Sequence, residues 1–335
     1  MIYPSRTFDA VGTTMRRILK LGAAVFGALL WVLPAQAQYP DRIIKLVVPF
    51  PPGGGVDLIA RMVGQGLAEE LGQPVVIENK AGGGTLMGTD YVAKSAPDGH
   101  TLVLASFAHA VNPSLQAKMP YDTAKAFQPI GLIGRSYNVL VTSPKSKLKT
   151  VGDIIKASKE KPGSLTYASQ GIGTSAHLAG ELFKNLGGVD IVHVPYRGVA
   201  QALQDVLSGQ VDMMWPTSAA ATALINGGQF HAVASTAPAG KSPMSGVSTI
   251  AEQGLAGYVV DGWYGVYAPA GTPRDIVAKL NTTLNRVVQK VEFQRRVEPE
   301  GLVVTPGTPE AFDAFVQGEV LRWNKIVVEN KITAE

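Results

Sequence analysis

The chain has 335 residues, a formal net charge of +4 and no cysteine. The absence of cysteine excludes a disulfide framework, a thiolate zinc site, a cysteine nucleophile and a lipid-anchored cysteine. Residues 1–37 carry four basic residues and one acidic residue, so the chain from residue 38 onward has a net charge of only +1. A nearly neutral chain with scattered charges argues against nucleic acid or an anionic membrane as its partner.

The N-terminal segment, residues 1–37, has the pattern of a secretory signal peptide. Basic residues within 16–20 precede an apolar run at 21–33 and the sequence Ala-Gln-Ala at 35–37, which is the order typical of a cleaved signal. A retained membrane anchor is the alternative, but the apolar run is shorter than the roughly 20 residues that span a bilayer. Translation from Met1 and from Met15 both fit this pattern. We therefore expect a periplasmic protein whose mature chain begins at residue 38.

From residue 42 onward, short β-branched runs alternate with longer helical stretches. This alternation is typical of βα units around largely parallel sheets, and the 298 residues beyond the signal exceed the size of one growing core. We expect an α/β protein of two hinge-linked lobes with mostly parallel central sheets and a cleft between them. Lobe I comprises 38–140 plus 262–335, lobe II comprises 141–261, and strands near residues 140 and 260 form the hinge.

The individual elements follow from hydrophobic periodicity and from the glycine and proline residues that end each run. Strands are predicted at 43–48, 75–78, 101–105, 130–133, 139–142, 165–168, 191–194, 212–215, 232–235 and 258–267. Helices are predicted at 58–71, at 176–186, 199–208, 273–291 and 309–328, and in a segment that ends at residue 93.

A glycine-rich turn joins the first predicted strand to the first helix. The N-terminus of a helix presents unpaired backbone N–H groups and a partial positive charge, and glycine lets a ligand approach that backbone closely. A simple capping turn with Asp57 as the cap is the alternative, but a cap does not require the Pro-Pro-Gly-Gly-Gly run. We therefore interpret the turn as an anion site. Its candidate residues are Phe50, Pro52, Gly53, Gly54, Gly55 and Asp57.

A second strand, glycine turn and helix covers residues 167–178. Hydroxyl side chains stand beside the backbone N–H groups there, which suits a carboxylate ligand. Residues 171–176 also fit a relaxed dinucleotide fingerprint, but Asp190 precedes the next strand, whereas the fingerprint needs an acidic residue at its end. A dinucleotide is therefore disfavoured. The candidate residues are Ser169, Gly171, Gly173, Thr174, Ser175 and His177, of which the last is also compatible with a packed or capping role.

Three further segments supply weaker candidates. Tyr196, Arg197 and Gly198 lie between a strand and a helix, where Arg197 could pair with a second carboxylate or the whole segment could be a surface turn. Ser106 and Asn112 follow the third strand of lobe I. Aromatic residues at 215 and 263–264 fit either the cleft or the core.

Catalytic patterns are missing from these turns. No Gly-x-Ser-x-Gly elbow occurs, and apart from His177 the two glycine turns offer no histidine, lysine or paired carboxylates as acid and base. We therefore expect binding without turnover, with no catalytic residue, no metal and no cofactor. A hydrolase that uses Ser169 or Ser175 is the rival hypothesis.

Five segments together resemble a known family. They are Pro-Phe-Pro-Pro-Gly-Gly-Gly-Val-Asp at 49–57, Glu-Asn-Lys-Ala-Gly-Gly-Gly at 78–84, Pro-Asp-Gly-His-Thr-Leu at 97–102, Pro-Tyr-Asp at 120–122 and Val-Pro-Tyr-Arg-Gly at 194–198. In this order they resemble the extracytoplasmic receptors of tripartite tricarboxylate transporters, also called the Bug family. The resemblance runs from about Tyr39 to the end of the chain.

The resemblance implies a two-lobed periplasmic-binding-protein fold in which a ligand carboxylate lies between the glycine turns of opposite lobes. It places one half of the clamp at 50–57 and the other at 169–177 with Tyr196 and Gly198. It also implies a monomer that captures an amino acid, a di- or tricarboxylate or an aromatic acid for a two-component membrane permease. A ligand-presenting sensor and, less favoured, a periplasmic enzyme are the alternatives.

Overall fold

The computed structural model describes residues 1, 39–298, 301–329 and 331–333. The predicted signal peptide, apart from Met1, lies outside the described residues. The chain divides into two compact units, Met1–Asp41 and Arg42–Glu335, and all of the elements below belong to the second unit. In the described part of the chain, no helix combines the length and the apolarity needed to cross a bilayer.

Two β-sheets organise the unit Arg42–Glu335. The first sheet has six strands in the order β11-β4-β10-β3-β1-β2, and the second has five in the order β7-β6-β8-β5-β9. The strands of the first sheet are β1 (Ile44–Val48), β2 (Val75–Asn79), β3 (Thr101–Ser106), β4 (Phe127–Tyr137), β10 (Asp261–Pro269) and β11 (Leu302–Val304). Those of the second are β5 (Val139–Thr142), β6 (Leu165–Ser169), β7 (Ile191–Pro195), β8 (Met213–Met214) and β9 (His231–Ser235).

Both sheets are mixed, so the prediction of mostly parallel sheets is wrong in this respect. The βα units make parallel pairs, β1 with β2 and β3 and β6 with β7 and β8. The strands on which the chain passes between the sheets run the other way: β10 is antiparallel to β3 and β4, and β5 is antiparallel to β8 and β9. A strand that returns directly from another sheet has no crossover helix to reverse its direction, and it therefore pairs antiparallel.

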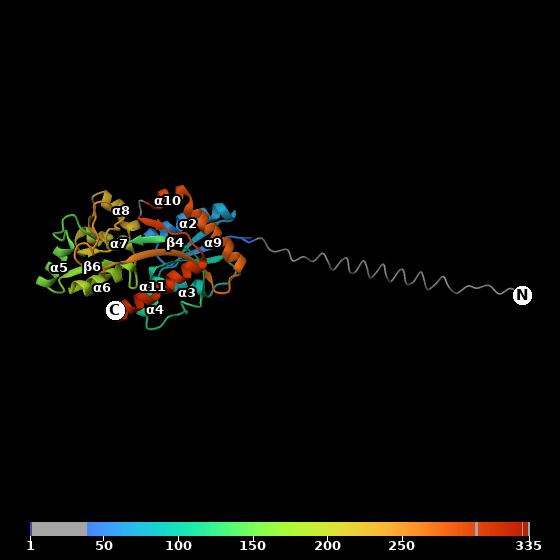
Figure 1. The fold of residues 1–335 in the computed structure, drawn as a ribbon, viewed down its shortest axis with the longest axis horizontal. Coiled ribbons are helices and arrows are strands. Elements are labelled where there is room, and N and C mark those ends of the chain that lie inside the picture. Colours follow the sequence, from blue (N-terminus) through green and yellow to red (C-terminus); the bar gives the residue numbers. More distant parts are fainter. Residues whose placement is uncertain (2–38, 299–300, 330, 334–335) are drawn as a thin grey trace. The chain divides into compact units, whose positions relative to one another are not determined.

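Helices cover both faces of the first sheet. Figure 1 shows α2 (Gly55–Leu71) and α10 (Val291–Val297) above β4, α9 (Arg274–Gln289) beside it, and α3 (Leu86–Ala93), α4 (Phe107–Leu115) and α11 (Pro309–Glu329) below it. The packing of α2 on α9 and of α11 on α4 agrees with this division into layers. The central strands β1, β3 and β10 are thus buried on both sides, which explains the largely apolar runs of β1 and β3.

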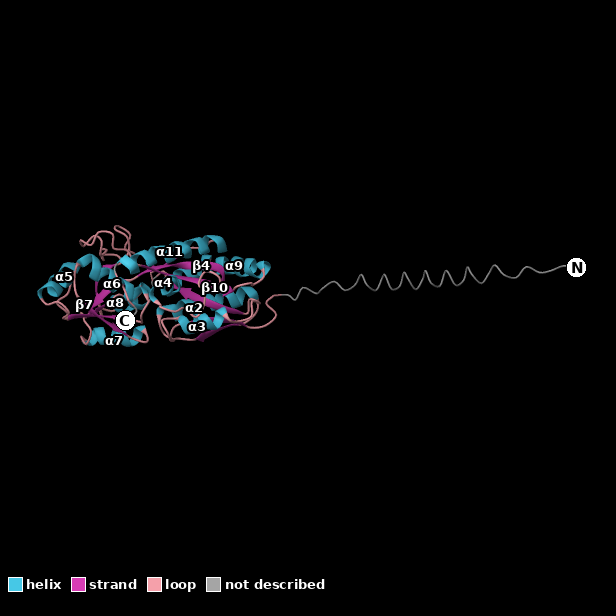
Figure 2. Ribbon diagram, turned by 90° about the horizontal axis from the view of Figure 1, so that it is seen from below, coloured by secondary structure: helices cyan, strands magenta, loops and turns pink. Residues whose placement is uncertain are grey.

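Four helices accompany the second sheet. They are α5 (Val151–Glu160), α6 (Ser175–Gly187), α7 (Val199–Ser208) and α8 (Ser218–Asn226), and in the turned view of Figure 2 they gather around β7, away from β10 and α9. The predicted helices and strands are all present, with ends shifted by up to a few residues. Helices α4, α5, α8 and α10 and strand β11 were not predicted.

The core of the second sheet extends into helices that precede and follow it in the chain. Phe107 of α4 and Trp323 of α11 belong to that core, and their rings meet edge to face with centroids 4.7 Å apart. Where the chain passes from β4 to β5, Asn138 accepts a hydrogen bond from the backbone N–H of Thr236 (2.9 Å), and its side-chain amide donates to the carbonyl of Trp215. The boundaries of the two lobes at residues 140 and 262 remain a prediction.

Candidate ligand-binding site

A cleft between the two sheets holds four connected cavities. The inner cavity, of about 20 Å³, is lined by Phe50, Val56, Ser106, Phe107, Ala108, Gln170, Thr174, Ser175, Thr217, Gly262, Trp263 and Tyr264. The middle cavity, of about 260 Å³, is lined by 50–56, Gln170, 197–201, Thr217 and Ala220. Two larger cavities continue from it: the groove, of about 560 Å³, between α2 and the α7–α8 pair, and the Arg197 chamber, of about 530 Å³, beside residues 81–85.

Helix N-termini converge on the inner and middle cavities. Helices α2, α4, α6, α7 and α8 all begin at residues that line one of the two cavities or directly follow one that does. The residues before four of these helices, Gly54, Ser106, Gly198 and Thr217, form no side-chain cap. The first N–H groups of those helices are therefore left to a ligand or to water, and each helix adds a partial positive charge. Such an arrangement attracts an anion.

Polar side chains complete the inner cavity. The buried Tyr264 hydroxyl has no hydrogen-bond partner of good geometry, although the Thr217 hydroxyl lies close to it. Burial raises the pKa of Tyr264 to about 12, so the hydroxyl keeps its proton and can donate it to a ligand oxygen. Gln170 lines three of the four cavities, and its buried Oε1 has no partner either. A buried polar group without a partner costs free energy, so both side chains favour a polar ligand group in this cavity.

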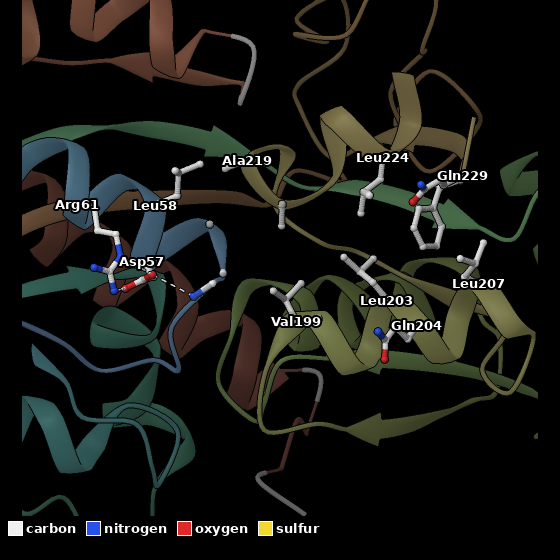
Figure 3. A pocket seen from close by; sticks show the side chains of 16 residues that line it. Asp57, Leu58, Arg61, Val199, Leu203, Gln204, Leu207, Ala219, Leu224 and Gln229 are labelled. Carbon is white, nitrogen blue, oxygen red and sulfur yellow. Dashed lines mark hydrogen bonds and ion pairs between the residues drawn. The ribbon is translucent and has the colours of Figure 1, made fainter. Parts of the chain in front are cut away.

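The first glycine turn is held in place by a buried carboxylate. The Asp57 carboxylate accepts hydrogen bonds from the backbone N–H of Gly53 (3.0 Å), from the Arg61 guanidinium (2.9 and 3.1 Å) and from the Asn79 amide (2.9 Å). Burial opposes the ionisation of Asp57, but these hydrogen bonds outweigh it and hold the pKa below the ordinary value of 3.8. Figure 3 shows Arg61 turned back onto Asp57. Asp57 thus shapes the turn.

The second glycine turn is held by neutral groups. The Thr174 hydroxyl donates to the carbonyl of Gly171 (2.6 Å), and the backbone N–H of Gly173 donates to Nδ1 of His177 (3.3 Å). The His177 ring lies against the His193 ring at 4.4 Å, and His193 stacks on Tyr167 at 4.8 Å. Burial lowers the pKa of His177 to about 4 and that of His193 to about 3, so both rings are neutral near pH 7.

The expectation that His177 is the sole histidine near these turns is wrong. Nε2 of His193 lies 2.7 Å from the Ser169 hydroxyl, because β6 and β7 are neighbouring parallel strands. Ser169 is 0 % exposed, and its hydroxyl also bonds both the carbonyl and the N–H of Gly171. The serine is therefore part of the support of the turn, and it lines none of the cavities described above.

The structure brings thirteen of the sixteen predicted residues to the walls of the cleft. Ser169, Gly173 and His177 lie behind the second turn and support it. The residues that line a cavity are Phe50, Pro52, Gly53, Gly54, Gly55, Asp57, Ser106, Gly171, Thr174, Ser175, Tyr196, Arg197 and Gly198. Tyr196 donates its hydroxyl to Asp205 at 2.6 Å, and Arg197 is exposed at the border of the middle cavity and its chamber.

Several lining residues were not predicted. Gln170 stands inside the second turn, and Thr217 directly precedes α8, a helix that the sequence patterns do not predict. For Tyr264 the sequence predicts only an aromatic residue of the cleft or the core. A threonine between proline and an alanine-rich run is a helix N-cap signal, so Thr217 could have been found. Among the described residues, no three histidine, aspartate or glutamate side chains are placed to share a metal ion.

Glycines allow the two sides of the cleft to approach each other at the turns. A Cβ atom on Gly173 would lie 2.7 Å from Oδ1 of Asn112, and one on Gly84 would lie 3.0 Å from the carbonyl oxygen of Ile172. Gly173 also has φ +79°, a conformation that other residues rarely adopt. The closeness of the two sides therefore depends on positions without a side chain.

Comparison with known proteins identifies the family. Residues 59–332 match the family described as tripartite tricarboxylate transporter family receptor. The chain belongs to this receptor family. The receptor is 31% identical to the solved periplasmic binding protein BugD, with a TM-score of 0.84 over 88% of this chain and 99% of BugD. The expected two-lobed fold is thereby confirmed, as is the resemblance to the Bug proteins.

Two further solved structures similar to the receptor carry ligands. Rpa4515 from R. palustris, solved with adipate, is 34% identical, with a TM-score of 0.85 over 88% of this chain and 99% of Rpa4515. MatC from Rhodopseudomonas palustris, solved with bound malate, is 32% identical, with a TM-score of 0.82 over 86% of this chain and all of MatC. Both ligands are small carboxylates.

Proposed function

We propose that this receptor captures a small carboxylate whose head group occupies the inner cavity. The observation that carries the proposal is the convergence of uncapped helix N-termini on a cavity that also holds the unpartnered Tyr264 hydroxyl. A volume of about 20 Å³ suits one small group and not a whole ligand. The rest of the ligand extends into the middle cavity and beyond. The adipate and malate found in relatives agree with this assignment.

Backbone N–H groups at the starts of α2, α4 and α6 bind the head group in this proposal. Hydroxyls of Ser106, Ser175 and Thr217 and the Tyr264 hydroxyl add neutral donors, and no cation lines the inner cavity. Binding an anion with N–H groups, hydroxyls and helix dipoles avoids the burial of an arginine or lysine when the site is empty.

The proposed role is binding without catalysis. A serine hydrolase needs its nucleophile where the substrate can reach it, but Ser169 is buried behind the turn and already hydrogen-bonded. Ser175 lines the inner cavity, while the His177 ring on the same helix is bonded to Gly173. Neither serine therefore has both an accessible hydroxyl and a free base.

Export and delivery complete the proposal. We place the protein in the periplasm after cleavage of residues 1–37, and its partner is the membrane component of a tripartite carboxylate transporter. Presentation of the loaded form to a sensor would use the same site. Co-purification of the tagged protein with a permease, or with a sensor, distinguishes the two.

Native mass spectrometry of the freshly purified protein, followed by thermal melting with malate, adipate and aromatic acids, tests carboxylate capture. A ligand at 100 times its dissociation constant stabilises the fold by about 2.7 kcal/mol, and the melting temperature should rise accordingly. The matched diamides, which lack the charge, should give no shift. A full panel of acids without any shift would contradict carboxylate capture, and release of a reaction product from a bound acid would contradict the absence of catalysis.

A further inference from the structure

The groove that leaves the middle cavity is apolar on both sides. Figure 3 shows the side chains of Val199 and Leu203 on α7 and of Leu224 on α8 directed toward the same space, and Leu58 on α2 lies beside Ala219 of α8. The remaining apolar lining residues are Ala200, Leu207, Ala220 and Phe230. Leu58 is 38% exposed and Leu207 is 43% exposed, so both leucines present apolar surface that nothing in the described chain covers fully. Exposed apolar surface in a concave site favours an apolar ligand group.

The groove offers no free positive charge to a second carboxylate. Among the residues that line the groove, Arg61 alone is cationic. Both Nε and Nη2 of Arg61 donate hydrogen bonds to the Asp57 carboxylate. The other polar side chains of the lining are the uncharged Gln204 and Gln229. A carboxylate that entered the groove would lose hydration without gaining an ionic partner, which costs free energy.

The groove is continuous with the place proposed for the head group. It shares the glycine turn 53–55, Val199, Ala200 and Ala220 with the middle cavity. The middle cavity in turn shares Phe50, Val56, Gln170 and Thr217 with the inner cavity. One molecule can therefore place its head in the inner cavity and its body in the groove.

We propose that the groove is the subsite for an apolar ligand body, so that the preferred ligand is a carboxylate bearing an alkyl chain or an aromatic ring. This inference rests on the proposed function, because the inner cavity fixes the head of the same molecule. It narrows that function, because malate-like and citrate-like acids bring further charges that the groove does not match. The competing direction is the Arg197 chamber, where an exposed arginine would suit a second carboxylate.

Isothermal titration of the full mature protein with acids of matched length tests the proposal. Hexanoate and adipate have six carbons each and differ in whether the far end is a methyl group or a carboxylate. We expect hexanoate to bind at least tenfold more tightly than adipate. Octanoate should bind more tightly than hexanoate by roughly three- to fourfold per added methylene, the gain typical of apolar burial.

The outcomes separate this inference from the proposed function. Tighter binding of adipate or malate than of hexanoate would overturn the apolar subsite and leave carboxylate capture intact. Binding of none of the acids would contradict the head-group site itself. Equal affinity for hexanoate and octanoate would also overturn the apolar subsite, because the chain would then lie in water.

A double variant, Leu58→Gln with Leu207→Gln, tests the position of the chain. Both leucines are exposed and glutamine is a good helix former, so the fold should persist, which a melting curve checks. We expect the increase in affinity from hexanoate to octanoate to fall to less than twofold in this variant. The matched control is Leu186→Gln on α6, which replaces a leucine of similar exposure, 41%, outside the groove. An unchanged gain in the double variant, or an equal loss in the control, would overturn the assignment.

Discussion

The two glycine turns present helix N-termini to the same cavities but are supported by opposite chemistry. The first turn depends on an ionised carboxylate, Asp57, held by Arg61, Asn79 and a backbone N–H. The second depends on a serine, a threonine and two neutral imidazoles. One support requires a charge and the other requires its absence. The geometry of an anion site therefore does not dictate the groups that hold it, and each turn should fail under different conditions.

The largest difference in carboxylate affinity between the turns should come from replacing a glycine by a residue with a side chain. Gly173→Val places a branched side chain at φ +79° and against Oδ1 of Asn112, whereas Gly54 has φ −92° and a Cβ atom added there would lie 3.3 Å from Val199 Cγ1. We expect Gly173→Val to weaken carboxylate binding by at least 100-fold and Gly54→Ala by less than threefold. Titration calorimetry measures both. Melting curves must first show that each variant is folded, and equal affinities for the two would contradict the difference.

Removal of the charged support should destabilise the first turn. Asp57→Ala leaves a backbone N–H and the amide of Asn79 without their acceptor, and Arg61 without its ion partner. Because Arg61 is largely exposed and its charge is screened, we expect a loss of about 2 kcal/mol in the free energy of unfolding. Asp57→Asn, which keeps the shape and one of the two acceptor oxygens, should lose less. Urea denaturation measures the loss, and an Asp57→Ala variant as stable as the parent would contradict this role.

Acid should weaken the second turn before the first. The pKa values of His177 and His193 in the folded protein lie below the ordinary value of 6.5, so their stabilising contribution is complete above about pH 6.5 and falls as the pH drops toward 4. Between pH 7 and pH 5 we expect each of these two histidines to lower the free energy of unfolding by about 1 to 2 kcal/mol. The contribution of Asp57 is lost only below pH 3.8, because its pKa is lowered as well.

Unfolding curves recorded at pH 7, 6 and 5 measure that dependence. His193→Gln should flatten it, and His231→Gln, which replaces a histidine on the far strand β9, is the matched control. Burial also lowers the pKa of His109 in α4 to about 4. His109 is present in every variant, so it makes the same contribution to the pH dependence of stability in each of them. An undiminished slope in His193→Gln would show that the second turn is not the acid-sensitive one.

The smallest effect should come from one hydroxyl of the inner cavity. Tyr264→Phe removes a buried hydroxyl without a well-placed partner, so stability should be unchanged or slightly increased while carboxylate affinity falls five- to tenfold. Tyr258→Phe is the contrasting control, because that hydroxyl donates to the carbonyl of Ala179 at 2.7 Å and should matter for stability alone. Unaltered affinity in Tyr264→Phe would remove this residue from the site.

Local patterns predicted most of the fold and both turns, because each strand, glycine turn and helix is encoded by adjacent residues. They could not supply the direction of β10 or the contacts that depend on strand register. Ser169 and His193 meet because β6 pairs with β7 in a register that puts Tyr167 opposite His193, and alternate residues of a strand share a face. Tyr264 reaches the inner cavity from β10, a strand more than 150 residues after the first turn, and no local sequence pattern predicts that the two lie together.

The positions of the tryptophans bear on the intrinsic fluorescence of the protein. Trp215, Trp263 and Trp323, the tryptophans of the described residues, are all fully buried, and Trp263 lines the inner cavity with its indole N–H unpartnered. Trp323 packs on Phe107, which also lines that cavity. Entry of an anion changes the electric field at indole rings that are otherwise shielded from water. Intrinsic fluorescence should therefore report occupancy of the site without a label, and Trp263→Phe would show how much of the signal arises at the cavity wall.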